Sequence, residues 1–222
     1  MAYDLEEQEQ LASLQAFWKK FGNLITWGLI AVLGAYAAYN YWNYHQRNEA
    51  LGASTLYNNL QTALEAKDNV QVQRVAGDIQ GKFKGSSYAQ MSALAAAKSA
   101  FDAGDLKAAK AQLQWVAANG SDEYKAIAKL RLSGVLLDEK AYDEALALLA
   151  TPIMAQFAGA VADRKGDVLV AQNKVNEARA AYLAALGAMD KKNPGRRLVE
   201  MKLEAIGGVV PADAAAAPKA AA

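Results

Sequence analysis

The chain has 222 residues, of which 53% are hydrophobic and 21% are charged, and 24 Lys and Arg nearly balance 23 Asp and Glu. This composition excludes a collagen-like or a disordered chain, and the net charge of +1 gives no whole-chain basis for nucleic-acid binding. Because the sequence has no Cys and one His, a disulfide framework, a Cys-ligated metal and a His-pair metal site are excluded.

Residues 1–20 are predicted to form a short cytoplasmic helix. Asp4 and Glu7 have the spacing of a capping box, and acidic residues in a first turn suit the helix dipole. Apolar side chains recur on one face, at Leu11, Leu14 and Trp18. We interpret the segment as a solvated lead-in to the membrane, and the alternative is a contact surface for a cytosolic partner.

An uncharged run lies between Lys20 and Arg47. Within it, residues 21–44 would form a helix about 36 Å long, enough to cross a hydrocarbon core about 30 Å thick. Aromatic residues flank both ends, as expected at the headgroup layers: Phe17, Trp18 and Phe21 before it, and Tyr36, Tyr39, Tyr41, Trp42 and Tyr44 after it. The sequence therefore predicts a single membrane-spanning helix.

A cleaved signal peptide is the alternative, because Ala35-Tyr36-Ala37 fits a small-x-small cleavage site. The long acidic segment before the run, and the continuation of the run past that site, favour an uncleaved signal anchor. Lys19 and Lys20 flank its N-terminal end, whereas only Arg47 lies close on the other side. The positive-inside rule then favours a cytoplasmic N-terminus, with the rest of the chain outside the cytoplasm.

Small residues form a stripe within the membrane segment, at Gly28, Ala31, Ala35 and Ala38. Their spacing of three and four places them on one face, and small residues let membrane helices approach closely. The alternative is that Ala and Gly are simply common in such segments, since the stripe lacks a GxxxG pair. We treat the four residues as candidates for helix packing in the membrane.

The segment from residue 45 to 206 shows helical spacing and almost no strand signal. Three stretches are alike: AGDLKAAKAQL, KAYDEALALL and NKVNEARAAYLAAL. Aligning Ala109, Ala145 and Ala178 gives spacings of 36 and 33 residues. A period near 34 is typical of helix–turn–helix repeats, which must stack because one pair cannot bury its apolar face.

These stretches resemble tetratricopeptide repeats. The third copy matches best, with Gly166 at the expected helix crossing, then Leu169, Ala178, Tyr182 and Ala185. Ser133 and Ala97 replace that glycine in the other copies, and all three copies lack the closing Pro of the family. The predicted fold is all-α, with a single N-terminal transmembrane helix followed by a tetratricopeptide-like α-solenoid domain.

A further helix pair is predicted before these copies, and a capping helix after them. Residues 47–66 would form one helix with the apolar set Leu51, Leu56, Leu60 and Leu64, and Asp68 would cap a second with Val72, Val75 and Ile79. Residues 196–206 would form the last helix, with Leu198, Met201, Leu203 and Ile206 as its apolar set. Residues 207–222 are rich in Ala and Pro, which predicts a disordered tail.

The family resemblance implies a concave surface lined by the first helix of each pair. The transferred groove positions are Met91, Leu94, Lys98, Phe101 and Asp102 in one copy, and Ile127, Leu130, Gly134, Leu137 and Asp138 in the next. The six large apolar members, Met91, Leu94, Phe101, Ile127, Leu130 and Leu137, are the candidate protein-binding residues. The alternative is that this face packs internally, because apolar stripes on helices usually face a core.

Motifs for catalysis are missing from the sequence. We interpret His45, at the end of the predicted span, as an interfacial residue, and nothing in the sequence matches a phosphate-binding GxxxxGK[ST] loop. Acidic pairs such as Asp143 and Glu144 stand at helix starts, where capping explains them. We expect a protein that is not an enzyme and that needs no cofactor or metal.

An acidic N-terminus, one signal anchor and about four repeat pairs make the chain similar to the YfgM family, ancillary subunits of the SecYEG translocon. The motifs FDAGDLKAAKAQL and DRKGDVLVAQNKVNEA add to the resemblance, which covers residues 1–206. It implies a bacterial inner-membrane protein with a periplasmic domain, association with SecYEG and with the periplasmic chaperone PpiD, and a role in handling newly translocated proteins. The alternative is a structural or signalling adaptor that binds no unfolded clients.

Overall fold

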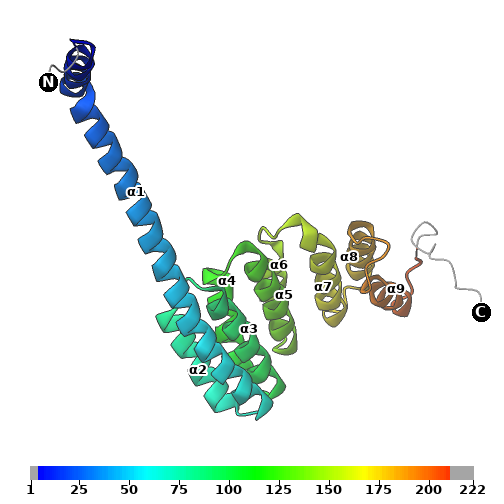
Figure 1. Ribbon diagram of the computed structural model, residues 1–222. Coiled ribbons are helices and arrows are strands. Elements are labelled where there is room, and N and C mark those ends of the chain that lie inside the picture. The colour runs from blue at the N-terminus through cyan, green and yellow to red at the C-terminus, as the bar shows by residue number, and fades with distance from the viewer. Residues whose placement is uncertain (1–4, 211–222) are drawn as a thin grey trace, which may run out of the picture. The chain divides into compact units, whose positions relative to one another are not determined.

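The computed structural model describes residues 5–210, and every regular element in that range is a helix (Figure 1). The helices are α1 (Leu5–Glu65), α2 (Asn69–Lys82), α3 (Ser87–Asp102), α4 (Leu106–Asn119), α5 (Asp122–Asp138), α6 (Tyr142–Ala150), a 3-10 turn η1 (Ala155–Phe157), α7 (Ala158–Ala171), α8 (Val175–Ala188) and α9 (Arg196–Ala205). The described residues fall into two compact units that divide between Leu51 and Gly52. The predicted all-α architecture is confirmed.

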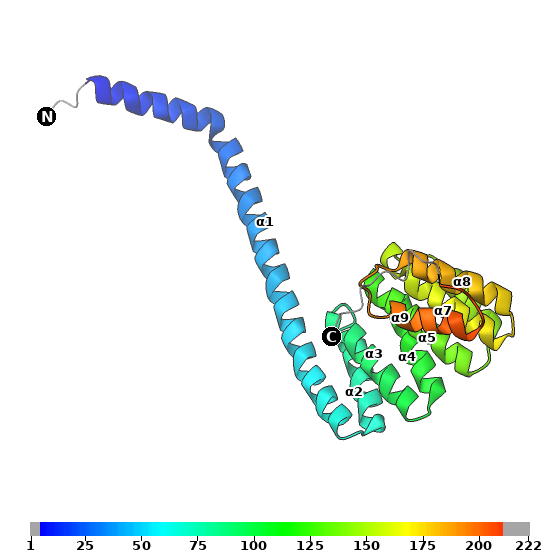
Figure 2. The ribbon, with the colours of Figure 1, turned by 90° about the vertical axis from the view of Figure 1, so that its right-hand side faces the viewer.

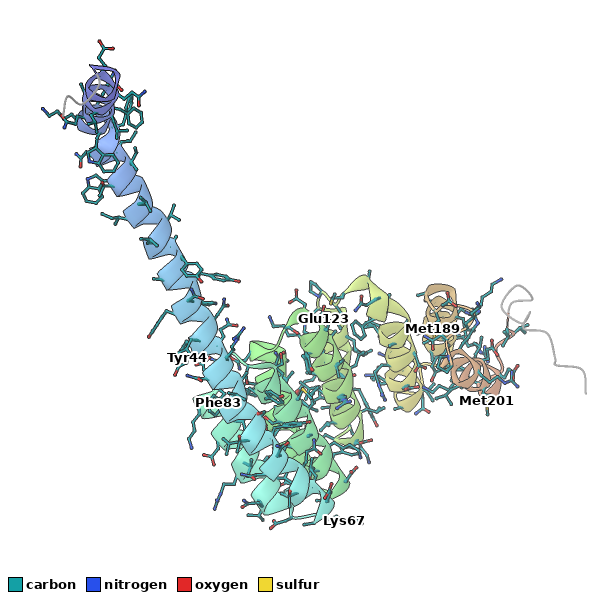
Figure 3. All side chains as sticks on the ribbon, in the orientation of Figure 1. Tyr44, Lys67, Phe83, Glu123, Met189 and Met201 are labelled. Atoms are coloured by element: carbon teal, nitrogen blue, oxygen red, sulfur yellow. The ribbon has the colours of Figure 1, made fainter. Side chains whose placement is uncertain are left out.

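The first unit consists of the N-terminal part of α1, and its apolar side chains are mostly exposed. Leu24, Trp27 and Val32 are 65–72% exposed, and Figure 3 shows side chains projecting from this part of the helix on all sides. The stretch Glu9–Glu65 contains a window that is long and apolar enough to cross a membrane, and 6% of that window is buried. Asp4 lies outside the described residues, so the predicted capping box is not described.

The second unit consists of four helix pairs and the final helix α9. The pairs are the end of α1 with α2, which share one apolar cluster, then α3 with α4, α5 with α6, and α7 with α8. Successive pairs pack against one another, and Figure 2 shows them stacked in sequence order. Each pair therefore buries its apolar side chains partly within itself and partly against the next pair.

One type of turn joins the helices of all four pairs. Its central residue has a positive φ, at Lys67 (54°), Gly104 (79°), Lys140 (61°) and Asn173 (59°). The amide of the following residue donates to the carbonyl five residues back, as in Asp68 to Ala63 and Asp105 to Ala100. This is the Schellman hydrogen bond that ends a helix, and its recurrence shows that the repeats share backbone geometry as well as residue pattern.

The predicted N-cap of α2 is confirmed. The Asp68 carboxylate accepts a hydrogen bond from the Gln71 amide at 3.0 Å, and Asp105 does the same for Ala108 at the start of α4. Val72, Val75 and Ile79 are buried, as expected. Leu60 is fully buried and Leu56 and Leu64 are partly buried, but Leu51 is 66% exposed, which corrects its place in that apolar set. Leu51 is the last residue of the first unit, before the packed repeats begin.

Small side chains let the helices of each pair cross closely. Ala109, Ala145 and Ala178, the aligned alanines of the three copies, are all 0% exposed. A Cβ atom added to Gly166 would overlap the Tyr182 ring, so only glycine fits under that ring. Ser133 and Ala97 occupy the equivalent positions of the other copies and are also buried. The predicted register of the repeats is thus confirmed by the packing.

Polar contacts connect successive pairs. The Gln80 side-chain amide donates to Gln112 at 2.6 Å, which joins α2 to α4. Lys110 on α4 forms an ion pair with Glu139 at 2.9 Å, and this hydrogen bond raises the pKa of Lys110. Because both side chains are about one quarter exposed, the pair is screened by water and contributes alignment more than stability.

The last helix, α9, packs on α8, as its predicted capping role requires. Arg196 donates to the carbonyls of Leu186 and Met189 at the end of α8, and Arg179 on α8 donates to the Ile206 carbonyl at the end of α9. Each arginine thus satisfies carbonyl groups at a helix C-terminus, where cations are favoured. These hydrogen bonds therefore hold α8 and α9 together at both ends.

The predicted apolar set of α9 is wrong in two positions. Leu198 and Met201 are 55% and 53% exposed, whereas Val199 is 1% exposed and packs with Leu203. The helix docks on the face that carries Arg196, Val199 and Leu203, because that rotation brings the guanidinium of Arg196 to the carbonyls of α8. The contact with α8, and not the number of apolar residues on each face, determines which face of α9 is buried.

A charged cluster under α9 completes this end of the solenoid. Lys202 lies between Asp163 and Asp167 at 2.8 Å from each, and the Tyr182 hydroxyl donates to Asp167 at 2.9 Å. Burial, together with the negative charge of Asp167, raises the pKa of Tyr182. The phenol therefore stays a hydrogen-bond donor across the physiological range of pH.

Replacing Ala145 with Leu should destabilise the repeat unit by about 1–3 kcal/mol, because the buried crossing has no room for a larger side chain. The matched control is Ala147→Leu on the exposed face of the same helix, which should change the free energy of unfolding by less than about 0.5 kcal/mol. Denaturant unfolding of the full chain in detergent, followed by circular dichroism, measures both. Equal midpoints for the two variants would contradict the packing described here.

Gly104→Ala should lower the free energy of unfolding by about 1 kcal/mol, because its φ of 79° is disfavoured once a Cβ is present. Gly77→Ala, in the exposed middle of α2, should raise it by about 0.5–1 kcal/mol, since Ala favours the helix. Neither Cβ would meet an atom within 4 Å, so backbone conformation alone separates the two changes. Opposite signs in the same unfolding assay are expected; a stabilising Gly104→Ala would refute the assigned turn.

Candidate protein-binding groove

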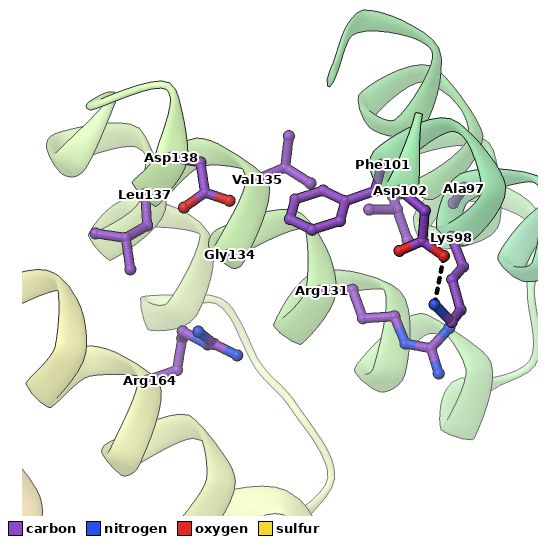
Figure 4. Close-up of a pocket in the computed structure, with 11 residues that line it drawn as sticks. Ala97, Lys98, Phe101, Asp102, Arg131, Gly134, Val135, Leu137, Asp138 and Arg164 are labelled. Atoms are coloured by element: carbon purple, nitrogen blue, oxygen red, sulfur yellow. Dashed lines mark hydrogen bonds and ion pairs between the residues drawn. The ribbon is translucent and has the colours of Figure 1, made fainter. Parts of the chain in front are cut away.

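A groove of about 450 Å³ opens across the first helices of three successive pairs, α3, α5 and α7 (Figure 4). Its walls carry charged side chains and its deeper part carries apolar ones. The lining residues are Ala97, Lys98, Phe101, Asp102, Leu113, Arg131, Gly134, Val135, Leu137, Asp138 and Arg164. We call this feature the A-helix groove.

The repeat brings equivalent residues to the same side of the A-helix groove. The spacings of 36 and 33 residues make Phe101 equivalent to Leu137, and Arg131 equivalent to Arg164. Asp102 and Asp138 are equivalent in the same way. Because each pair stacks on the next in the same orientation, a residue type that recurs at one repeat position forms a row along the groove.

The apolar row is partly open to solvent. Phe101 is 43% exposed, and Figure 4 shows its ring pointing from α3 toward Gly134 and Val135 of α5. Leu137 is half-buried, while Val135 and Leu113 beneath it belong to the core. An apolar side chain of a partner could therefore lie on Phe101 and Leu137 without disturbing the core.

The charged side chains of the groove differ in whether they are paired. Lys98 and Asp102 form an ion pair at 2.6 Å, and Arg164 lies 3.5 Å from Asp167 of its own helix. Within residues 5–210, Arg131 and Asp138 have neither an ion pair nor a hydrogen bond from their side chains. These two groups keep their hydrogen-bonding capacity for a ligand.

The guanidinium of Arg164 lies close to Gly134 in the groove. A Cβ added to Gly134 would lie 3.7 Å from a guanidinium nitrogen of Arg164, which is ordinary van der Waals contact. The guanidinium thus lies against the backbone of α5 and forms the wall of the groove toward the third copy. A side chain larger than Ala at position 134 would push this wall outward.

The structure distributes the ten transferred groove positions between the groove, the core and its margin. Six line the A-helix groove: Lys98, Phe101, Asp102, Gly134, Leu137 and Asp138. Leu94 is 8% exposed and packs inside the core cluster with Ala97 and Leu132, so its side chain is not presented to a partner. Met91, Ile127 and Leu130 are half-buried and lie outside the groove lining.

Arg131 and Arg164 were missed by the sequence reasoning. Arg131 is four residues after Ile127 and three before Gly134, so it shares a helix face with these transferred positions. Arg164 follows Arg131 by the repeat spacing of 33. Both arginines would have been found if the groove positions of the family had also been transferred to the third copy, and if charged as well as apolar residues had been considered.

A second cavity of about 610 Å³ adjoins the first toward the N-terminal pair. It shares Lys98 and Asp102 with the A-helix groove and reaches Leu64, Lys67 and Asn69. The two cavities thus form an extended surface on the second unit, with the Lys98–Asp102 ion pair between them.

The membrane stripe has open space along it in the first unit. Gly28, Ala31, Ala35 and Ala38 are all exposed, and a Cβ added to Gly28 would meet no atom within 4 Å. Their role in helix packing stays a prediction. For the part of the chain described here, no group of three or more His, Cys, Asp or Glu side chains is placed to hold a metal ion.

Comparison with known proteins agrees with this architecture. Residues 15–208 match the tetratricopeptide repeat-like domain family. An ancillary SecYEG translocon subunit of Neisseria gonorrhoeae is 37% identical over 210 residues, which cover 93% of this chain and 100% of the relative. A protein of the same name from Escherichia coli is 33% identical over 184 residues, 81% of this chain and 87% of the relative, and one from Haemophilus influenzae is 28% identical over 187 residues. No solved structure gives a significant match.

The match to the domain family and the full-length relative agree with the resemblance read from the repeat motifs. The chain belongs to the tetratricopeptide repeat-like family that includes the ancillary SecYEG translocon subunits.

Proposed function

We propose that this chain is a membrane-anchored ancillary subunit of the Sec translocon whose repeat domain binds other proteins. The observation that carries the proposal is the 37% identity to an ancillary SecYEG translocon subunit over that relative's whole length. The A-helix groove and the apolar N-terminal helix supply the two parts that such a role needs, a binding surface and an anchor. The proposed role is recognition without catalysis.

The proposed topology follows the charges that flank the span. Residues 1–20 lie in the cytoplasm, residues 21–44 cross the inner membrane, and residues 45–206 form the periplasmic repeat domain. The predicted tail, residues 207–222, lies outside the described residues from position 211 onward. Lys19 and Lys20 on the cytoplasmic side support this orientation through the positive-inside rule. In the periplasm the repeat domain would meet segments as they leave the translocon.

The chemistry of the A-helix groove defines what it would bind. An apolar side chain fits over Phe101 and Leu137, while a carboxylate beside it would pair with Arg131 and a base with Asp138. We propose that the partners are SecYEG, the periplasmic chaperone PpiD and newly translocated proteins that are passed to chaperones. The six apolar candidate residues then reduce to Phe101 and Leu137 for direct contact.

A second function is favoured by the charged lining. Five of the eleven lining residues are charged, and such a surface suits a defined partner segment better than many unrelated unfolded chains. On this alternative the protein is a structural or signalling adaptor that tethers envelope proteins. The two functions predict different crosslinked species: varied secretory chains for the first, and one folded partner for the second.

Single cysteines placed on either side of the span should test the topology, since the natural chain has none. Gln114→Cys, on the exposed face of α4, should react with a membrane-impermeant maleimide in spheroplasts, and Ser13→Cys should react only after lysis. The reverse pattern would overturn the orientation. A mature chain that begins after Ala37 would refute the anchor.

A photo-crosslinking amino acid at Phe101 or Leu137 should capture translocon subunits, PpiD or secretory chains in native membranes. The matched controls are Ala111 and Ala147, which are exposed and occupy one equivalent repeat position on α4 and α6. Crosslinks are expected from the groove positions and not from the controls. Equal yields from both sets would remove the groove from the mechanism.

Reversing one groove charge should weaken this capture. Arg131→Glu is expected to lower the crosslinking yield about tenfold, equivalent to about 1.4 kcal/mol of binding. Lys107→Glu makes the same charge change at an exposed position on α4, outside the groove, and should leave the yield unchanged. A similar loss in both variants would show that only the overall charge matters.

A further inference from the structure

The helix before the membrane span carries an apolar face. Large apolar side chains recur at spacings of three and four residues and are exposed: Leu11 56%, Leu14 65%, Phe17 51%, Trp18 61% and Phe21 37%. The opposite face carries small and polar side chains, including Glu9, Ala12, Ala16 and Lys20, all exposed. This segment is therefore amphipathic, with the apolar face that the sequence predicts at Leu11, Leu14 and Trp18.

The junction between this segment and the span has two features that bend helices. Gly22 is buried under the Trp18 indole, which lies 3.2 Å from where a Cβ on Gly22 would stand. The Thr26 hydroxyl donates to the Gly22 carbonyl at 2.7 Å, and such back-bonding competes with the helix ladder. Within the first unit, Figure 2 shows the N-terminal end of α1 turned away from the rest of that helix.

If α1 continued straight along the membrane normal, the apolar face of this segment would be exposed to water. Leu11 precedes Phe21 by ten residues, so along the membrane normal it would stand about 15 Å out in the aqueous phase. If the segment instead lies along the surface, all five apolar side chains reach the boundary between headgroups and acyl chains. The bend at the junction is what this arrangement requires.

We propose that residues 9–21 lie flat on the cytoplasmic surface of the membrane as an interfacial amphipathic helix, with lipid as the partner of its apolar face. The inference rests on the proposed anchor and orientation, because the helix runs directly into the span. Continuity with the span holds this face at the bilayer surface without any further contact. Lipid covers it there, and a protein partner is not needed.

The residue types on the face favour the headgroup layer. Phe17 and Phe21 have ring centroids 5.0 Å apart, and aromatic rings partition to this layer. The Lys20 ammonium lies 5.4 Å from the centroid of the Phe21 ring, so its stem follows the ring while its charge stays at the level of lipid phosphates. Lys19 and Lys20 lie at the end of the segment next to the span, where long lysine side chains can reach anionic headgroups, whereas Glu9 lies at the far end of the segment.

Site-directed spin labelling of the full chain tests the proposal. Single cysteines at positions 10 to 20 accept a nitroxide, and the chain needs no prior cysteine removal. The labelled protein is reconstituted in phosphatidylcholine vesicles with about one quarter phosphatidylglycerol. Frequent collision of the nitroxide with oxygen indicates that the label lies in lipid, and frequent collision with a water-soluble nickel chelate indicates that it lies in water. Collision with oxygen should dominate at positions 11, 14 and 18, and collision with nickel at positions 12 and 16, so that the preference alternates with the period of a helix.

A label at Leu33 separates failure of the anchor from failure of this inference. If Leu33 is not in the bilayer, the proposed anchor itself is refuted. If Leu33 is in the bilayer, three patterns overturn the interfacial helix. Nickel access at every position means a solvated lead-in, protection from both reagents means a protein partner or a second copy, and a steady increase of depth toward position 20 means a helix along the normal.

A matched pair of substitutions gives a second readout. Leu14→Glu should abolish the preference of a label at position 18 for oxygen over nickel, because it places a charge on the lipid-facing side. Ala12→Glu, on the opposite face, should leave that preference intact. The label at Leu33 should report the bilayer in both variants. A loss of preference in both variants, or in neither, would overturn the assignment of the lipid-facing side.

Discussion

The repeat domain depends on the close crossing of the two helices in each pair. Ala109, Ala145 and Ala178 are fully buried, and Gly166 lies directly under the Tyr182 ring. Small side chains at these points bring helix axes together, so the large side chains on either side can fill the space between successive pairs. A larger residue at any crossing would separate the pair and remove contacts with its neighbour.

The stacking of equivalent helix crossings determines where the groove lies. Because every pair closes through the same Schellman turn, successive first helices present equivalent residues on one side. Phe101 and Leu137 form an apolar row in this way, and Arg131 and Arg164 form a charged one. The A-helix groove is thus a consequence of the repeat register, and its chemistry is set by a few residues that differ between copies.

The two units of the chain differ in whether their apolar side chains are buried. The repeat unit buries alanine, leucine and valine against neighbouring helices, whereas Leu24, Trp27 and Val32 of the first unit stay exposed and suit an apolar solvent. Leu11, Leu14 and Trp18 are exposed as well, but they occupy one side of a helix. Exposed apolar side chains all round a helix suit a segment that spans a membrane, whereas exposed apolar side chains on one face suit a helix that lies on a membrane surface.

Residue type and spacing are enough to predict the elements that depend on local chemistry and on the repeat period. The uncharged run of residues 21–44, the Asp68 cap and the aligned alanines follow from spacing and residue type, and the structure has helices, a cap and buried crossings at these positions. Which side of a helix is buried depends on its packing against neighbouring helices. Leu94 faces the core and Phe101 the groove, Val199 is buried and Leu198 exposed, and Arg131 and Arg164 form a wall. In Ala-rich helices most faces are apolar enough to be buried, so the positions of neighbouring helices select the face that packs.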